Sequence, residues 1–466
     1  MKYISTRGNA PELDFEDVLL TGLAEDGGLY VPQEWPTFSA DELRAMRGKS
    51  YCEIALMVMR PFLGNAIPDD TLKAMVEQAY STFAHPAVAP LKQLNDNDWL
   101  LELFHGPTLA FKDVAMQILG HMMDYVLNKR GQRATIVGAT SGDTGGAAIE
   151  AFRGRDAVDI FIMFPHNKVS DVQRRQMTTV LDHNVHNIAL EGTFDDCQNM
   201  LKAMFNHRAF RSEIALAGVN SINWARVMAQ SVYYFTSAIA LGAPDRSISY
   251  CVPTGNFGDI LAGYVAKRMG LPVHMLTAAT NSNDILARTM ETGRYEMSGV
   301  VATTSPSMDI QVSSNFERLL FDSVERDSNE VVRMMSGLQQ SGSFTIPQQA
   351  YTKLKREFNA GRADEQAVSS IIATTLDQTG ELLDPHTAVG VQVAQNIQRD
   401  HTVPMVTLST AHPAKFPDAV MAASGIHPNL PERLADLAER EERYDILSND
   451  QDLVENFISA RSRAAQ

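Results

Sequence analysis

Short apolar runs alternate with helix-like segments from about residue 98 onward, and this alternation limits the possible folds more than any other feature of the chain. Strands are predicted where the runs are rich in β-branched residues, at 134–137, 159–164, 247–252, 273–278 and 405–408. Helices are predicted between them, for example at 146–152 and 260–269. Apolar strands separated by helices form parallel sheets that are covered on both faces. The chain is therefore predicted to be an α/β protein, long enough at 466 residues for two such lobes.

The two ends of the chain differ from this central pattern. Near the N-terminus, acidic amphipathic segments at 39–46 and 72–83 are divided by turn signals, which predicts a mostly helical domain. Near the C-terminus, residues 430–466 are charged and helix-prone, for example at 432–444, which predicts a solvated pair of helices without chemistry. The predicted units are an N-terminal domain, a catalytic α/β region and a C-terminal helical extension, at 1–95, 96–430 and 431–466.

The formal net charge is −16, which argues against a nucleic-acid partner, since such proteins carry clustered lysines and arginines. The overall field of so acidic a protein repels anions. An anionic ligand must therefore be met by a local site, and the expected partner is a small molecule.

The three cysteines are too few and too far apart for a disulfide framework or a zinc site. They are Cys52, Cys197 and Cys251. Residues 1–8 lack the apolar core of a secretory signal, and no apolar run is long enough to span a bilayer. We expect a cytoplasmic protein with reduced thiols, no metal and no membrane contact.

One lysine occupies an unusual place, within the segment HGPTLAFKD at 105–113. Lys112 follows three apolar residues and directly precedes a helical pattern. Burial there would favour the neutral amine, which can attack a carbonyl and form a Schiff base with an aldehyde cofactor. The alternative is a lysine that merely adds a charge at a helix start.

Two loops have the composition of anion sites. Each lies between a predicted strand and a predicted helix, at 138–146 and at 253–259. Glycines in such loops let backbone N–H groups and a helix dipole converge on one ligand. Each loop alone could be an ordinary turn, and neither carries a dinucleotide or P-loop fingerprint. A third candidate, Thr410, stands at the carboxyl end of a predicted strand, where α/β proteins place ligands.

The order and content of these segments closely resemble the threonine synthase family, within the fold type II group of pyridoxal-phosphate enzymes. The resemblance covers nearly the whole chain. It is carried by the segments 27–32, 105–113, 140–145, 220–226, 255–258, 309–318 and 410–416. It implies the long form of the enzyme, with an extra N-terminal domain joined to a two-lobed catalytic region with parallel-rich sheets.

The resemblance implies pyridoxal 5′-phosphate as the cofactor and Lys112 as the residue that carries it. The cofactor's phosphate is expected on the second loop. The residues of this loop that contact the cofactor are expected to be Gly255, Asn256, Phe257, Gly258 and Asp259. Thr410 is expected to hydrogen-bond the pyridine nitrogen. A neutral hydroxyl there softens the electron sink, which should favour elimination and replacement over transamination.

The implied substrate is O-phosphohomoserine, which brings a carboxylate and a phosphate. The hydroxyl-bearing residues Thr140, Ser141 and Thr144 are expected to face these anionic groups. Arg226, with Asn223 beside it, is the first choice for the phosphate, because arginine binds phosphate in bidentate fashion. Lys415 is the second choice. The alternative for both cations is an ordinary salt bridge.

Asp143 raises a question. Related enzymes such as cysteine synthase have an asparagine there that donates to the cofactor's ring oxygen, whereas an ionised aspartate would repel it. Three explanations stay open: Asp143 is protonated, it contacts another group, or the ring oxygen is protonated in this subgroup.

The implied reaction is γ-elimination of phosphate followed by addition of water at Cβ, which gives threonine. Lys112 would move the α- and β-protons. The rival candidates are another fold type II enzyme, such as cysteine synthase or threonine dehydratase, and a non-catalytic homologue. The former lack the long leader and the approach at 105–108. The protein is expected to be a monomer or a small homo-oligomer.

Overall fold

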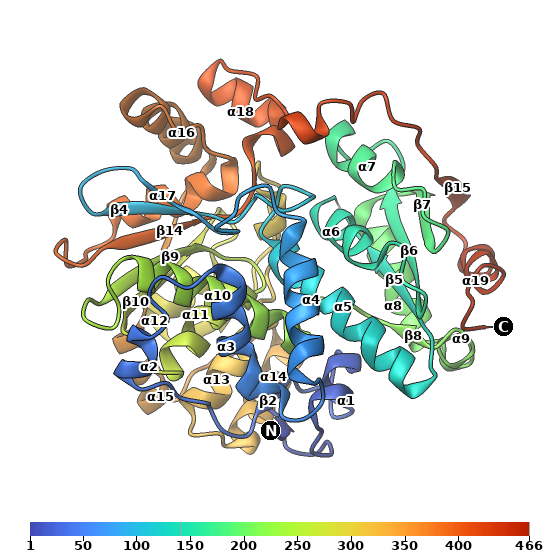
Figure 1. The fold of residues 1–466 in the computed structure, drawn as a ribbon, viewed down its shortest axis with the longest axis horizontal. Helices are drawn as coiled ribbons and strands as arrows, with labels where there is room; N and C mark the ends of the chain where they lie inside the picture. Colours follow the sequence, from blue (N-terminus) through green and yellow to red (C-terminus); the bar gives the residue numbers. More distant parts are fainter. Residues whose placement is uncertain (141, 466) are drawn as a thin grey trace.

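The computed structural model describes residues 1–140 and 142–465, which form two parallel-rich sheets placed side by side (Figure 1). The larger sheet has the order β13-β10-β9-β14-β4-β3, and only β3 and β4 pair antiparallel. Its strands are β3 (Leu91–Gln93), β4 (Asp98–Glu102), β9 (Ile248–Pro253), β10 (Val273–Thr280), β13 (Phe358–Arg362) and β14 (Met405–Ser409). The predicted α/β class with two lobes is confirmed.

The smaller sheet is parallel throughout, in the order β15-β7-β6-β5-β8. Its strands are β5 (Ala134–Ala139), β6 (Val158–Pro165), β7 (Val185–Glu191), β8 (Leu216–Ala217) and β15 (Asp445–Ser448). Every residue of β6 and of β9 is buried, as expected for apolar strands covered on both faces.

Helices cover both sheets. Those of the catalytic region are α5 (Lys112–Arg130), α6 (Asp143–Phe152), α7 (Asp171–Thr178), α8 (Phe194–Asn206), α9 (Arg208–Glu213), α10 (Trp224–Ala240), α11 (Gly258–Arg268), α12 (Ile285–Thr292), α16 (Glu365–Thr379), α17 (Pro385–Asn396) and α18 (Pro417–Ser424). Helix α5 packs on α6 and α10, and α17 lies against β9, β10 and β14. Two of the predicted helices begin earlier than expected, at Asp143 and Gly258, so both anion loops are shorter than the sequence suggested.

A smaller unit follows α12. It contains the hairpin β11 (Arg294–Glu296) and β12 (Ser343–Thr345), with α13 (Phe316–Ser323), α14 (Ser328–Ser341) and α15 (Gln348–Glu357). The chain between β11 and α13 has one short 3₁₀ turn, η1 (Pro306–Met308), and this stretch lines the cavity described below.

The N-terminal segment is mostly helical, with α1 (Phe15–Leu20), α2 (Ala40–Arg44), α3 (Tyr51–Leu63), α4 (Asp69–Ser81) and the strand pair β1 (Tyr3–Ser5) and β2 (Tyr30–Pro32). It shares its core with the catalytic region, because the rings of Tyr3, Trp35 and Phe62 surround the buried Trp224 of α10. The expected boundary at residue 95 falls inside the β3–β4 hairpin, so the last strand before it belongs to the larger sheet.

The predicted helix at 432–444 is wrong. Only the 3₁₀ turn η3 (Glu432–Leu434) forms there, and the chain then continues through β15 to a single helix, α19 (Gln451–Ser459). Tertiary contacts override the helix propensity. Arg174 and Thr178 of α7 donate to the Glu442 carboxylate over 2.8 and 2.7 Å, and the Arg443 backbone N–H donates to the Thr178 carbonyl.

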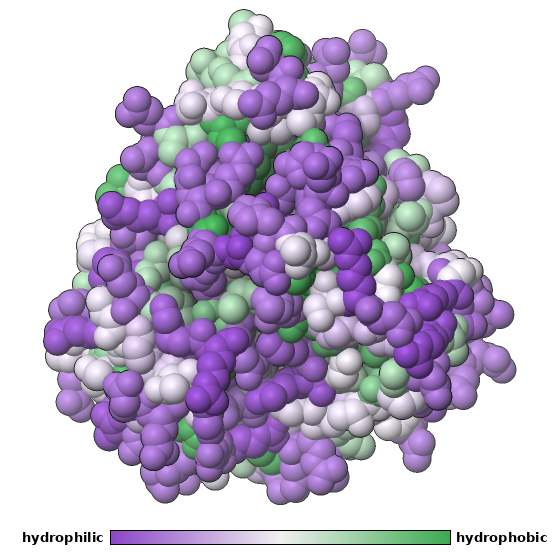
Figure 2. All heavy atoms as spheres, turned by 90° about the vertical axis from the view of Figure 1, so that its left-hand side faces the viewer, coloured by the Kyte–Doolittle hydropathy of each residue, from purple (hydrophilic) through white to green (hydrophobic). Residues whose placement is uncertain are grey.

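Figure 2 shows a largely hydrophilic face, on which apolar side chains appear in small patches between polar ones. Scattered patches of this kind are normal on a folded protein. Among the described residues, no helix is both long and apolar enough to cross a membrane.

Candidate active site

A cavity of about 370 Å³ lies between the two sheets and collects most of the predicted site residues. Strands β5, β9 and β14 all end at it, which is where open parallel sheets bind ligands. The predicted residues that line it are Lys112, Thr140, Asp143, Thr144, Arg226, Gly255, Asn256, Gly258, Asp259 and Thr410. Phe257, Asn223 and Lys415 are not among the lining residues, and Ser141 lies outside the described residues.

Lys112 is the first residue of α5 and is buried, with a relative exposure of 8%. The preceding loop is fixed at several points. Leu109 adopts the left-handed conformation at φ 62°, and the Phe111 N–H donates to the Thr410 carbonyl over 2.8 Å. The Asp113 carboxylate accepts from the backbone N–H and the hydroxyl of Thr108. The loop therefore holds the amine at the cavity rather than in solvent.

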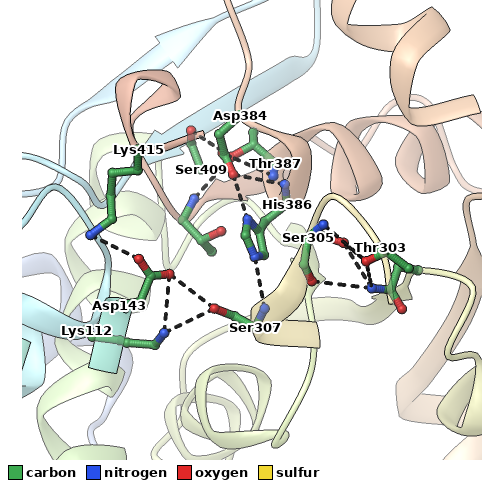
Figure 3. A network of polar contacts seen from close by, with 12 residues as sticks. Lys112, Asp143, Thr303, Ser305, Ser307, Asp384, His386, Thr387, Ser409 and Lys415 are labelled. Atoms are coloured by element: carbon green, nitrogen blue, oxygen red, sulfur yellow. Dashed lines mark hydrogen bonds and ion pairs between the residues drawn. The ribbon is translucent and has the colours of Figure 1, made fainter. Parts of the chain in front are cut away.

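Two further charged side chains, Asp143 and Lys415, lie beside this amine (Figure 3). The two oxygens of Asp143 are shared between two lysines: Oδ2 lies 3.5 Å from the Lys112 Nζ, and Oδ1 lies 3.0 Å from the Lys415 Nζ. Burial alone would raise the pKa of Asp143, but the ammonium groups of Lys415 and Lys112 hold it well below its usual range. Of the three explanations for Asp143, this geometry favours contact with another group.

At Lys112, burial has the larger effect on the pKa and outweighs the neighbouring carboxylate. Burial lowers the pKa of Lys112, the Asp143 carboxylate opposes this, and the positive charges of Lys415 and Arg226 add to the lowering. A lysine with a lowered pKa supplies the neutral amine that carbonyl chemistry requires.

The second anion loop follows β9 and leads into α11. Phe257 adopts the left-handed conformation at φ 64°, and its buried ring packs on Phe316 and Phe358 instead of entering the cavity. A Cβ on Gly255 would lie 2.7 Å from the Ser307 carbonyl oxygen, so this position has room only for glycine. The loop thus brings the N-terminus of α11 to the cavity, where a helix favours an anion.

Asp259, in the first turn of α11, is also buried. Burial raises the pKa of its carboxyl to about 7, although the Ile260 N–H donates to it. Near neutral pH this group is therefore only partly ionised, which reduces its repulsion of an anion at the same helix end.

Arg226 lies in the first turn of α10 with a relative exposure of 4%. Its Nη1 donates to the Val219 carbonyl over 3.1 Å, whereas its buried Nε has no hydrogen-bond partner within residues 1–140 and 142–465. Burial lowers the pKa of its guanidinium to about 10. A buried cation without a carboxylate partner, next to a cavity, is suited to bind an anionic ligand.

Two residues predicted to contact substrate have other roles in the structure. Asn223 is the N-cap of α10: its Oδ1 accepts from the Ala225 N–H, and its Nδ2 donates to the Leu19 carbonyl. Lys415 is buried at 1% exposure and donates to the Thr108 carbonyl and the Gln176 Oε1, besides its ion pair with Asp143. The structure brings neither side chain to the cavity.

The hydroxyl-bearing residues differ from one another. The Thr140 Oγ1 accepts from the N–H groups of Gly142 and Gly145, so it shapes the loop before α6. Thr144 lines the cavity. Thr410 also lines it, and the Thr410 N–H donates to the Thr387 Oγ1 over 3.2 Å.

A polar chain that the sequence did not predict begins at Lys112, whose Nζ donates to the Ser307 hydroxyl over 3.3 Å (Figure 3). The Ser307 hydroxyl donates to Asp143 over 3.1 Å, and the Ser307 N–H lies 3.4 Å from the His386 Nε2. The His386 Nδ1 lies 3.0 Å from an oxygen of Asp384, the N-cap of α17. The aspartate followed by proline at 384–385 is a helix-start signal, so the sequence could have placed His386 in a first helical turn.

Comparisons with known proteins agree along the chain. The family "Threonine synthase N terminus" matches residues 2–80, "Pyridoxal-phosphate dependent enzyme" matches 84–341, and "Threonine synthase, C-terminal" matches 387–458. The threonine synthase of Pseudomonas aeruginosa is 56% identical, with 98% of each chain covered. That of Saccharomyces cerevisiae is 40% identical, over 98% of this chain and 97% of the yeast protein.

Solved structures give the same result. The pyridoxal-phosphate-bound threonine synthase from Brucella melitensis is 60% identical, with a TM-score of 0.98 over 99% of this chain and all of that chain. The yeast threonine synthase is 39% identical, with a TM-score of 0.94 over 99% and 98% of the two chains. By sequence and by fold, the chain belongs to the threonine synthase family, a family of pyridoxal-phosphate-dependent lyases.

Proposed function

We propose that this enzyme converts O-phospho-L-homoserine and water into L-threonine and phosphate, the last step of threonine biosynthesis. The observation that supports this most is the pairing, in one cavity, of a helix N-terminus for one phosphate with a buried arginine for another. A cofactor phosphate and a substrate phosphate need two such sites, and the helix N-terminus and Arg226 offer one each.

The residues around the cavity fit pyridoxal phosphate. Lys112 offers a buried amine for its aldehyde, the loop from Gly255 to Asp259 offers a helix N-terminus for its phosphate, and Thr410 offers a neutral hydroxyl for its ring nitrogen. When bound, the cofactor withdraws electrons from the substrate and so acidifies the hydrogen at Cα.

Lys112 is the group placed to move protons. Once the substrate's amine has displaced it, the freed Nζ would take the proton from Cα and later handle the proton at Cβ, so that phosphate can leave from Cγ. Water then adds at Cβ. Arg226 and Thr144 would hold the substrate's anionic groups, and the hydroxyl of Ser141 was also predicted to do so.

Loop geometry leads to a first testable prediction. Gly255→Ala should weaken the affinity for pyridoxal phosphate by about tenfold or more. A Cβ there would lie 2.7 Å from the Ser307 carbonyl oxygen, so either the second anion loop or the backbone at Ser307 must move. Titration of the apoenzyme with cofactor, followed by tryptophan fluorescence, measures this. Gly299→Ala is the matched control, since a Cβ there meets nothing within 4 Å. Equal affinities for the two variants would contradict the assignment.

The function itself is tested by phosphate release from O-phosphohomoserine, with threonine identified as the product. O-acetylserine and free threonine serve as comparison substrates, because they are the substrates of the rival fold type II enzymes. Faster turnover of either would contradict the proposal. The three cysteines are free, which suits the reducing cytoplasm that we propose as the compartment.

A further inference from the structure

A second lysine, Lys415, contacts the same carboxylate as Lys112. The Lys415 Nζ lies 3.0 Å from the Asp143 Oδ1, on the far side of the carboxylate from Lys112. Its other contacts are the Thr108 carbonyl at 2.6 Å and the Gln176 Oε1 at 3.2 Å. An ammonium has three donors, so these three contacts leave none for a ligand.

We propose that Lys415 is a positioning residue whose buried ammonium is the lasting counter-ion of Asp143, so that Lys112 is free to lose its proton and react. This inference rests on the proposed role of Lys112. It also replaces the sequence-based expectation that Lys415 binds the substrate phosphate.

Charge balance in the buried site supports this role of Lys415. If Asp143 had Lys112 as its only cation, the pair would be stable as an ion pair, and the amine would stay protonated. Lys415 at 3.0 Å is the nearer of the two ammonium groups, and Lys112 at 3.5 Å is the farther. When Lys112 becomes neutral, Asp143 therefore keeps a cation and is not left as an unpaired buried charge.

Lys415 also holds Lys112 in place. Its bond to the Thr108 carbonyl ties the 3₁₀ turn η2 (Pro413–Lys415) to the loop that presents Lys112, and the same carbonyl accepts from the Gln176 Nε2 over 3.3 Å. The Lys415 side chain thus both balances the charge of Asp143 and holds the loop that presents Lys112.

If the charge of Lys415 controls Lys112, two variants should shift the pH at which Lys112 becomes reactive in opposite directions. The charged or titratable groups that surround Lys112 are Asp143 on α6, Arg226 on α10, Asp259 on α11, His386 on α17 and Lys415 on η2. In Lys415→Met, Lys112 is the lysine that remains beside Asp143, so the carboxylate stabilises the Lys112 ammonium. Asp143→Asn removes the carboxylate and leaves Lys112 beside a positive charge, which destabilises the ammonium.

The experiment follows the reactivity of Lys112 itself and not turnover. Apoenzyme is exposed briefly to pyridoxal phosphate across pH 6 to 10, the bond is reduced with borohydride, and the modified lysine is located by peptide mass. We expect the half-maximal pH of attachment to rise by about one unit in Lys415→Met and to fall by about one unit in Asp143→Asn. Lys415→Arg should stay close to the unaltered protein, as should Lys129→Met, which changes an exposed lysine of the same helix α5.

Each outcome decides something. Profiles that do not move, or that move in the same direction in both variants, contradict the role of Lys415. Modification of other lysines but not Lys112 in the unaltered protein contradicts the proposed function instead. If Lys415→Met does not fold, the double variant Asp143→Asn/Lys415→Met, which has no unpaired carboxylate, is compared with Asp143→Asn. The double variant should be half-maximal at the higher pH, and identical profiles would overturn the inference.

Discussion

Replacing Lys112 with alanine should reduce the rate of threonine formation at saturating substrate by at least about 10⁴-fold, because one amine both carries the cofactor and moves the protons. The loss should appear in kcat even when pyridoxal phosphate is supplied in excess. The measurement is phosphate release from O-phosphohomoserine, corrected for the uncatalysed rate.

The fold should survive this change. Asp143 keeps its ion pair with Lys415, and removal of a desolvated ammonium relieves an unfavourable burial. We therefore expect the thermal midpoint of Lys112→Ala to equal or exceed that of the unaltered protein. Lys129→Ala, at the exposed end of the same helix, is the matched control and should keep full activity. If Lys112→Ala retained more than about a tenth of the activity, proton transfer by this lysine would be excluded.

Replacing Arg226 with methionine should raise KM for O-phosphohomoserine by about 10- to 10²-fold, since a charge-assisted pair with phosphate contributes roughly 1.5–3 kcal/mol. The buried guanidinium has no carboxylate partner among the described residues, so its removal leaves no unpaired opposite charge. Initial rates over a range of substrate concentrations separate KM from kcat.

The same variant distinguishes two phosphates. Arg226 shares the cavity with the phosphate loop at Gly258, so it could in principle serve the cofactor. In that case Arg226→Met would weaken pyridoxal phosphate and leave KM unchanged once the cofactor saturates. We expect the opposite, an unchanged cofactor affinity with a raised KM. Arg333→Met, an exposed arginine of α14 paired with Glu330, controls for the loss of one positive charge.

The sequence predicted those strands and helices that are specified by their own residues and immediate neighbours. The buried strands β6 and β9 were found because covered parallel strands are apolar throughout, and α6 and α11 were found because glycine-rich loops precede them. The helix predicted at 432–444 was wrong because its charged residues bind α7, a contact between segments that are distant in sequence.

In the active site, too, contacts between distant segments could not be predicted from local patterns. Lys112 could be singled out from its apolar neighbours and the resemblance. That Lys415 pairs with Asp143 could not, because nothing local distinguishes a lysine that ends in a buried ion pair from one that meets a ligand. Asn223 was placed near the substrate because it precedes Arg226, whereas its side chain caps a helix. His386 reaches the cavity only through the packing of α17, which a single sequence does not reveal.

In the proposed reaction, the Cγ–O bond of the substrate breaks and water adds at Cβ. Turnover in ¹⁸O-labelled water, followed by mass spectrometry of both products, tests it most directly. We predict one ¹⁸O atom in the hydroxyl group of threonine, and phosphate that leaves with only its original oxygens. Label in the phosphate, with homoserine as the other product, would show hydrolysis at phosphorus and contradict the account.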